Sequence, residues 1–386
     1  MKKFDVAQLS DERDAVDTAY APVQTEAYNQ QYRDWRCREG NLFSFRGRLR
    51  QTVHTYVDGI GMQESAPVKR EESALRNVFL LITVMVLIYE LVENVLLVPL
   101  LLLFKVLGVE ISYSFNDSIA YGNQYAVLCV LLFESLLKHL LPMLLIHKQL
   151  RMPKAAAFPM KIRDPWHVGI AVSMLCFGFF IAGFLRLLFP VEIFNVNNIG
   201  MTYEVISYMD VWCSSVYLIF ELIITPILAE FLFHGMLFQA LRQFGVSYAV
   251  FVIAFLNTTM MHDPVAFAMV FVTSVAAGYG IWQSGSLLTG ILIHFLSRSM
   301  SFLLFQSEDF PALGILSGSM CLVFAVLLIG VILWLLLCVL GKGNWKMRDY
   351  STFLTTAQKT KIAVCSGPML ITWGLCFVLM MIEIFV

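Results

Sequence analysis

The feature that most constrains this chain is a series of hydrophobic segments, most of them long enough to cross a lipid bilayer. About 20 apolar residues span a hydrocarbon core of roughly 30 Å. The segments run over residues 78–104, 125–146, 166–189, 211–241, 248–261, 264–282, 287–305, 313–340 and 362–386. In lipid, helices satisfy their own backbone hydrogen bonds. The pattern therefore predicts an all-α, polytopic transmembrane helical bundle of eight or nine spans.

The composition supports this class and excludes others. Of the 386 residues, 58% are hydrophobic and 14% are charged, whereas about a quarter are charged in soluble domains. The net charge of −1 gives no basic footprint for nucleic acid, and no Gly-rich phosphate loop occurs. We therefore expect a lipid bilayer as a partner, and neither nucleic acid nor nucleotide.

Charged residues alternate between the loops. One set of loops carries Lys148, Arg151, Lys154, Lys161, Arg163, Arg242, Lys342, Lys346, Arg348, Lys359 and Lys361. The loops between them carry Glu110, Asp117, Glu192, Glu204, Asp210, Glu308 and Asp309. The positive-inside bias predicts a multi-pass protein of the cell membrane with a cytoplasmic N-terminus. We favour nine spans, because a re-entrant fifth segment would place the last basic loop outside.

Four regions follow from this pattern: a polar cytoplasmic tail (1–76), N-terminal transmembrane helices (77–205), a core (206–306) and C-terminal transmembrane helices (307–386). The tail holds a basic and aromatic patch. Its members are Arg33, Trp35, Arg36, Arg38, Phe43, Phe45, Arg46, Arg48 and Arg50. The patch either contacts anionic lipid or belongs to a solvated, partly disordered tail, and we favour the second interpretation.

Ionisable side chains cluster in three segments of the core. Glu230 and His234 lie four residues apart and share one helical face. His262 ends the next segment, and His294 and Arg298 repeat the four-residue spacing farther on. A central charged residue costs roughly 2.5–3.5 kcal/mol on insertion scales, so such a cluster indicates a functional site. We expect the three spots to meet inside one bundle.

Further polar residues interrupt the first two segments. Glu90 and Glu93 lie in the first, and Glu134, Lys138 and His139 in the second. The spacing of Glu134 and Lys138 predicts a buried ion pair. A proton or ion path through these groups, and hence a transporter, is a less favoured alternative.

The core carries a family resemblance. The run Pro226-Ile-x-x-Glu230-x-x-Phe233-x-Gly235, then His262, then Gly278 followed by Ser284-Gly-Ser-Leu and His294, resembles the CPBP or Abi family. That family includes the type II CAAX prenyl proteases and bacteriocin-processing relatives. The resemblance covers roughly residues 211–302, about a quarter of the chain, and marks residues 206–306 as a CPBP-like core.

The resemblance implies a catalytic role for each motif. The family's motifs are Glu-Glu-x-x-x-Arg, Phe-x-x-x-His and His-x-x-x-Asn. The leading Glu and the second motif's His are expected to activate water for peptide hydrolysis, and the third motif's His and Asn to stabilise the oxyanion. This sequence has Ala229 for the leading Glu, His234 for the Arg, Thr258 for the Phe and Arg298 for the Asn. The resemblance thus implies catalytic positions at Glu230, His262, His294 and Arg298.

Two functions from different classes remain open. One is an intramembrane endopeptidase that cleaves a membrane-associated peptide or protein. The other is a catalytically silent relative that acts as a binding, immunity or regulatory partner. Neighbours on a helix point about 100° apart, so Glu230 cannot take over the role of position 229, which favours lost activity. Arg298 could either donate to an oxyanion or pair with Glu230.

A metal site is a further alternative. Glu230, His234, His262 and His294 are ligand types suited to zinc. Bound zinc would lower the pKa of a water molecule, and no leading Glu would then be needed. Four protein ligands would leave no open position, so one would have to stay out for catalysis. The favoured alternative is that these are neutral, hydrogen-bonded histidines.

Overall fold

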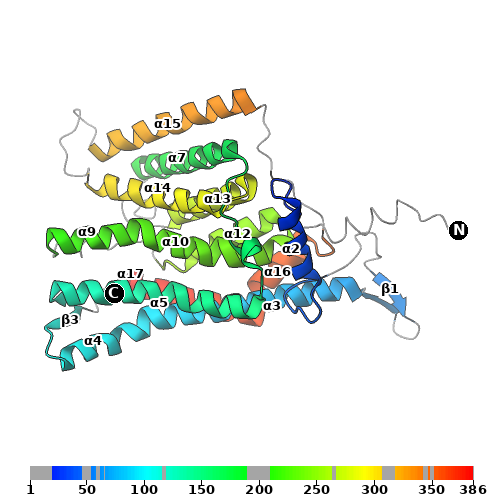
Figure 1. The fold of residues 1–386 in the computed structure, drawn as a ribbon, viewed down its shortest axis with the longest axis horizontal. Helices are drawn as coiled ribbons and strands as arrows, with labels where there is room; N and C mark the ends of the chain where they lie inside the picture. Colours follow the sequence, from blue (N-terminus) through cyan, green and yellow to red (C-terminus); the bar gives the residue numbers. More distant parts are fainter. Residues whose placement is uncertain are drawn as a thin grey trace.

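Long helices lying side by side, with their axes roughly aligned, make up most of the protein (Figure 1). The computed structural model describes residues 20–45, 54–57, 61–64, 66–114, 119–188, 209–262, 267–306, 318–341, 347 and 352–385. Over these residues the predicted helical class is confirmed.

Apart from α2 and the single turn α6, the helices of the first half follow the first three hydrophobic segments. They are α2 (Glu26–Cys37), α3 (Ala66–Glu90), the π-helical η1 (Leu91–Leu96), α4 (Leu97–Val106), α5 (Gln124–Leu150), the single turn α6 (Lys154–Ala157) and α7 (Pro165–Leu188). Asn123 caps α5, because its side chain accepts hydrogen bonds from the Tyr125 and Ala126 backbone amides.

The second half begins with one long, interrupted helix. It consists of α9 (Val211–Ile219), the π-helical η3 (Phe220–Ile224), α10 (Thr225–Glu230), the π-helical η4 (Phe231–Leu237), α11 (Phe238–Leu241) and the 3₁₀ turn η5 (Arg242–Phe244). After it come α12 (Val246–Thr259), α13 (Phe267–Ser284), α14 (Leu287–Gln306), α15 (Gly318–Gly341), α16 (Thr356–Cys365) and α17 (Gly367–Phe385).

Asp210 caps this interrupted helix, accepting the Cys213 amide at 2.7 Å. That backbone hydrogen bond lowers the pKa of the Asp210 carboxyl, because it favours the charged form.

Two short antiparallel hairpins add strands that the all-α prediction does not include. In one, β1 (His54–Val57) pairs with β2 (Gly61–Glu64), with His54 opposite Glu64. In the other, β3 (Ile111–Ser114) pairs with β4 (Ile119–Gly122) and joins α4 to α5. Both lie in connecting segments and leave the helical bundle unchanged.

By length and composition, the described residues contain three helices able to cross a membrane: Pro67–Val106, Gln124–Leu150 and Val211–Phe244. A fourth results if Thr356–Cys365 and Gly367–Ile382, bent by 60°, form one span. Four further apolar helices are shorter, among them Val246–Thr259. The count of eight or nine spans and the membrane orientation therefore stay predictions.

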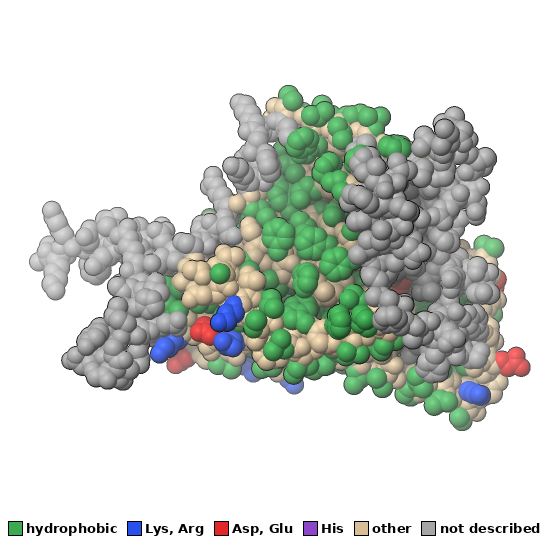
Figure 2. All heavy atoms as spheres, turned by 180° about the vertical axis from the view of Figure 1, so that it is seen from behind, with side chains coloured by type: hydrophobic (Ala, Val, Ile, Leu, Met, Phe, Trp, Pro, Cys, Tyr) green, Lys and Arg blue, Asp and Glu red, His purple; other side chains and the backbone are tan. Residues whose placement is uncertain are grey.

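The helices pack in layers. Helix α7 lies between α15 and α13, α13 also packs on α12 and α14, and α3 packs on α5 and α17. Hydrophobic side chains cover the middle of the face in Figure 2, whereas Lys and Arg gather near the end where α2 lies. This apolar outer surface fits a lipid environment.

Helix α2 packs onto one end of the bundle, contrary to the favoured prediction of a solvated tail. Tyr28, Tyr32 and Trp35 are buried and belong to the main hydrophobic core. The Tyr32 hydroxyl donates to the Gln239 carbonyl at 2.6 Å, and the Trp35 indole donates to the Leu150 carbonyl at 2.7 Å. Trp35 is therefore unavailable to lipid. Arg46, Arg48 and Arg50 of the predicted patch lie outside the described residues.

A buried guanidinium lies between α2 and the bundle and contacts aromatic rings of both. The Arg242 guanidinium, 1% exposed, lies 3.8 Å from the Tyr32 ring centroid and 5.4–5.5 Å from those of Tyr28 and Trp282. Aromatic faces attract such a cation more strongly where water is excluded. Helix α2 thus stabilises the end of the interrupted helix.

The structure places the described basic loops at the α2 end of the bundle. Leu150, next to Arg151, accepts from Trp35, and Arg163 donates its amide to the Ser284 carbonyl. At the opposite end, the Gln124 amide group donates to the Asp210 carboxylate at 2.8 Å. Glu192, Glu204, Glu308, Asp309, Asp117, Lys342, Lys346 and Arg348 lie outside the described residues.

Candidate functional site

The helix that carries Glu230 and His234 departs from regular α-helical geometry on both sides of Glu230. The π-helical η3 precedes α10 and the π-helical η4 follows it. Pro226 lies near the start of α10, where its missing N–H cannot complete a regular helical ladder. Such π turns are frequent at functional sites because they reorient side chains within a helix.

Glu230 lies between two imidazoles. Its Oε1 is 3.3 Å from the His294 Nδ1 of α14, within hydrogen-bonding geometry. Its Oε2 is 2.8 Å from His234 Nδ1, a close contact whose angles are not those of a hydrogen bond. The Glu230 side chain is 3% exposed and the His234 side chain is fully buried. The predicted one-face placement of Glu230 and His234 is confirmed, and His294 joins them.

Two glycines make room for this group. A methyl group at Gly290 of α14 would overlap the Glu230 carboxylate and the Ile281 side chain. One at Gly278 of α13 would lie 3.4 Å from His234 Nε2. Small residues let helices approach closely in membrane bundles. Gly278 and Gly290 therefore let α13 and α14 approach the helix that carries Glu230 and His234.

Arg298 pairs with Glu221, and the alternative contact with Glu230 is not formed. Its guanidinium Nη1 lies 2.5 Å from Glu221 Oε2 and 3.3 Å from the Glu221 backbone carbonyl. The other Glu221 oxygen accepts from the Thr225 hydroxyl at 3.1 Å. Both charged side chains are largely buried. As an oxyanion donor, Arg298 would have to give up part of this contact.

His262 contacts Glu90 and not the group around Glu230. Its Nε2 is 2.9 Å from Glu90 Oε1, although the angles are again not those of a hydrogen bond. The Asn94 amide group in η1 donates to the other Glu90 oxygen at 3.1 Å. His262 has a φ of 53°, a left-handed conformation that is uncommon for non-glycine residues. The predicted meeting of His262 with the other polar spots is thus not made through direct contact.

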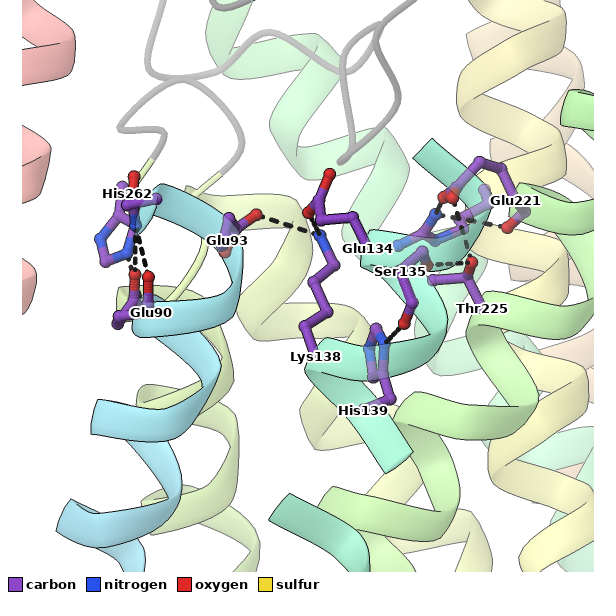
Figure 3. Close-up of polar contacts among 11 residues, drawn as sticks. Glu90, Glu93, Glu134, Ser135, Lys138, His139, Glu221, Thr225 and His262 are labelled. Atoms are coloured by element: carbon purple, nitrogen blue, oxygen red, sulfur yellow. Dashed lines mark hydrogen bonds and ion pairs between the residues drawn. The ribbon is translucent and has the colours of Figure 1, made fainter. Parts of the chain in front are cut away.

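In Figure 3, a group around Lys138 lies between the His262 and Glu90 contact and the group of Glu221. The Lys138 ammonium is 3.0 Å from Glu93 Oε1 and 3.3 Å from Glu134 Oε1. The predicted pair of Glu134 and Lys138 is confirmed, and Glu93 joins it. The next residue, His139, places its Nδ1 2.8 Å from the Ser135 carbonyl, one turn earlier in α5. Polar residues of α3, η1, α5 and η3 thus form a layer across the bundle.

Three of the four predicted metal ligands come together, and the fourth lies elsewhere. Glu230, His234 and His294 are in contact, while His262 lies on Glu90. Among the residues that the structure describes, no three His, Cys, Asp or Glu side chains lie so as to hold a metal ion. Each of the three histidines instead has a carboxylate as its nearest partner.

Sequence reasoning missed Glu221. It lies in the same hydrophobic segment as Glu230, four residues before Thr225. The Ser135 hydroxyl of α5 lies 3.2 Å from the Thr225 hydroxyl and extends this group to a third helix. A carboxylate within an apolar segment indicates a functional or structural polar site. By this criterion the sequence alone could have singled out Glu221.

A comparison with known protein families finds a match over the segment that contains Glu221, Glu230 and His294. Residues 211–300 match the family model described as Type II CAAX prenyl endopeptidase Rce1-like. This segment is Rce1-like. The match confirms the predicted resemblance over this segment. No curated protein and no solved structure matches the chain. Glu90, Glu93, Glu134 and Lys138 lie outside the Rce1-like segment and contribute polar groups to the same interior.

Proposed function

We propose that this CAAX protease-type membrane protein binds a membrane-associated peptide or protein without cleaving it. One observation carries the proposal: each side chain at a motif position is engaged by an internal partner. Glu230 lies between His234 and His294, Arg298 contacts Glu221, and His262 contacts Glu90. Position 229, where the family has its leading Glu, is Ala.

The chemistry of peptide hydrolysis explains why these contacts matter. A general base must lie within about 3 Å, or one water molecule, of the proton that it removes. Both Glu230 oxygens lie close to imidazole nitrogens, and the carboxylate is almost completely buried. A water-activating role would require Glu230 to leave one of these imidazoles. In this proposal the groups at the motif positions stabilise the packing of the helices instead of activating water.

An intramembrane endopeptidase is the second candidate, and the contact of Glu230 with His294 favours it. Glu230 Oε1 contacts His294 Nδ1, so the carboxylate orients the ring and leaves Nε2 as the nitrogen able to exchange a proton. Carboxylate-oriented imidazoles serve as general bases in hydrolases. Arg298, one turn farther along α14, would supply the oxyanion donor.

A fluorescent farnesylated peptide that ends in a CAAX sequence tests both candidates, since the family description names this substrate class. Purified wild-type protein in detergent is expected to bind the peptide by fluorescence anisotropy. It should release no product above the background of Glu230→Gln. The variant Ala229→Glu/His234→Arg restores the family motif, and we expect it to gain cleavage.

Cleavage by the wild type would overturn the non-cleaving proposal if His294→Ala and Glu230→Gln both abolish it. Loss of a general base lowers the rate about 10²–10⁴-fold, so the effect would be large. Absence of binding at micromolar peptide would exclude a prenylated CAAX ligand. His147→Ala serves as a control, because this histidine lies in the last turn of α5, outside the Rce1-like segment.

A further inference from the structure

The connector between α5 and α7 is a fixed structural element. The Tyr28 hydroxyl of α2 donates to the Ala156 carbonyl at 3.2 Å. The Leu287 amide donates to the Pro159 carbonyl at 2.6 Å, and the Arg163 amide donates to the Ser284 carbonyl at 2.9 Å. Three hydrogen bonds, one with α2 and two with the turn between α13 and α14, therefore hold the connector against the end of the bundle.

The inner side of the connector rests on the helix that carries Glu230. Ala156 and Ala157 are buried. The Phe158 ring meets the Phe231 ring edge to face, with centroids 5.1 Å apart. A methyl group at Gly235 would overlap the Phe158 ring, so only glycine permits this close approach. The connector thus packs against η4 at Gly235, the residue that follows His234.

The outer side is basic and apolar. Its exposed basic residues are Lys148, Arg151, Lys154, Lys161 and Arg163. Met160 and Ile162 flank Lys161 and are 41% and 39% exposed. Residues 148–163, the basic connector, contain no Asp or Glu. Asp164, which follows, directs its carboxylate to the Trp166 amide and to His167 instead.

We propose that the basic connector binds the phosphate-bearing headgroups of anionic lipids. It joins the end of α5, which is long and apolar enough to cross a membrane, to the start of the apolar helix α7, so it lies beside the membrane surface. Clusters of Lys and Arg beside a membrane helix attract anionic headgroups. Exposed apolar side chains among them enter the boundary between headgroups and acyl chains. The fixed backbone holds these residues close together before a lipid arrives, which lowers the entropic cost of ordering the loop on binding.

This inference does not depend on whether the chain cleaves a peptide. Since Phe158 rests on Gly235, lipid bound at the connector also stabilises the helix that carries Glu230. Binding should therefore raise the unfolding temperature of the whole chain.

The test is thermal unfolding of the purified full chain in a neutral detergent, with added phosphatidylglycerol or phosphatidylcholine. We expect phosphatidylglycerol to raise the unfolding temperature more than phosphatidylcholine does, and less so as salt increases. The variant Lys154→Gln/Lys161→Gln/Arg163→Gln should lose at least half of that difference. Lys105→Gln is the matched control, since Lys105 is exposed in the last turn of α4.

Native mass spectrometry supplies a second, independent readout. The wild type and Lys105→Gln should retain more phosphatidylglycerol than the triple variant does. Inorganic phosphate at equal ionic strength should leave the unfolding temperature unchanged, and an equal rise would assign the site to free phosphate instead of lipid. Equal effects of the two lipids, or an unchanged response in the triple variant, would overturn the proposal.

Discussion

At the scale of single residues, buried carboxylates and their cationic or imidazole partners define this interior. Glu221, Glu230 and Glu90 each contact such a partner. Removing water from a charge costs several kcal/mol, and a partner offsets most of that cost only while both remain. The stability of the bundle should therefore depend on keeping each pair intact, more than on the identity of any one charge.

Breaking the Glu221 and Arg298 pair tests this dependence. Arg298→Met would leave the Glu221 carboxylate buried without its cation, and we expect a loss of about 3–5 kcal/mol in the free energy of unfolding. The double variant Glu221→Gln/Arg298→Met removes both charges and should recover part of the loss. Denaturant unfolding in detergent measures both. A double variant as unstable as the sum of its single variants would contradict the pairing.

Gly290 allows a second test at this scale. Gly290→Ala places a methyl group into the Glu230 carboxylate and should destabilise the protein by about 1–3 kcal/mol, as overpacking does in cores. Gly374→Ala in α17 is the control, because no atom lies within 4 Å of the added methyl group. In that helix, alanine should instead stabilise by roughly 0.5–1 kcal/mol. Equal unfolding temperatures for the two variants would argue against close packing at Gly290.

Contacts between residues of one helix could be predicted from the sequence, whereas contacts between different helices could not. Glu230 and His234, like Glu134 and Lys138, are four residues apart, so helical geometry alone brings them together. The contact of His262 with Glu90 joins the end of α12 to α3. Its formation depends on how those helices pack, which a single sequence does not encode locally. The prediction that His262 would join the other polar spots was therefore not met by direct contact.

At the scale of elements, α2 is the least expected part of the fold. Its mean composition is polar, but Tyr28, Tyr32 and Trp35 fall on one face. The mixed charge of the tail hides this short amphipathic pattern. The π turns around α10 and the two hairpins carry no comparable sequence signal, since each depends on a local departure from a regular ladder. The long apolar helices were predictable because their length and composition satisfy the bilayer requirement.

Loss of the Tyr32 ring should loosen α2. Tyr32→Leu removes the ring face nearest the Arg242 guanidinium and the hydrogen bond to Gln239. An unpartnered buried polar group costs about 1–3 kcal/mol, so we expect a destabilisation of that order and faster tryptic cleavage within α2. Leu42→Ala is the control, because Leu42 is 67% exposed. Equal cleavage rates for both variants would contradict a fixed α2.

The Asp210 cap predicts an acid dependence of α9. The pKa of its carboxyl is lowered on folding by the hydrogen bond from the Cys213 amide. Its stabilisation is therefore present above the ordinary aspartate pKa of about 3.9 and is lost as the pH falls through the lowered value. Asp210→Asn keeps an acceptor but does not titrate, so its unfolding temperature should fall less steeply with acid. Parallel pH profiles for the two proteins would exclude this contribution.

At the scale of the whole molecule, the charged loops that the structure describes are grouped as the charge pattern predicts. Lys359 of α16 donates to the Phe244 carbonyl, and Phe45 of the tail contacts Phe353. The segment before α16 therefore lies at the α2 end, together with the basic connector. Lys105 is an exposed basic residue in the last turn of α4, on the helix that leads to the β3–β4 hairpin and Asp210. Basic residues are thus more frequent at the α2 end of the bundle than at the other end, where Lys105 lies.

The orientation in the membrane follows from this grouping and can be measured. With nine spans, α17 runs away from the α2 end, so a C-terminal tag should lie on the face opposite the basic connector (Figure 1). In sealed right-side-out vesicles from a variant without native cysteines, an impermeant maleimide should label Lys105→Cys at once. Lys154→Cys should react only after permeabilisation, because its loop carries the positive charge that stays inside. If the C-terminal tag and Lys154→Cys were accessible from the same side, one apolar segment would not cross, and a re-entrant 248–261 would account for eight spans.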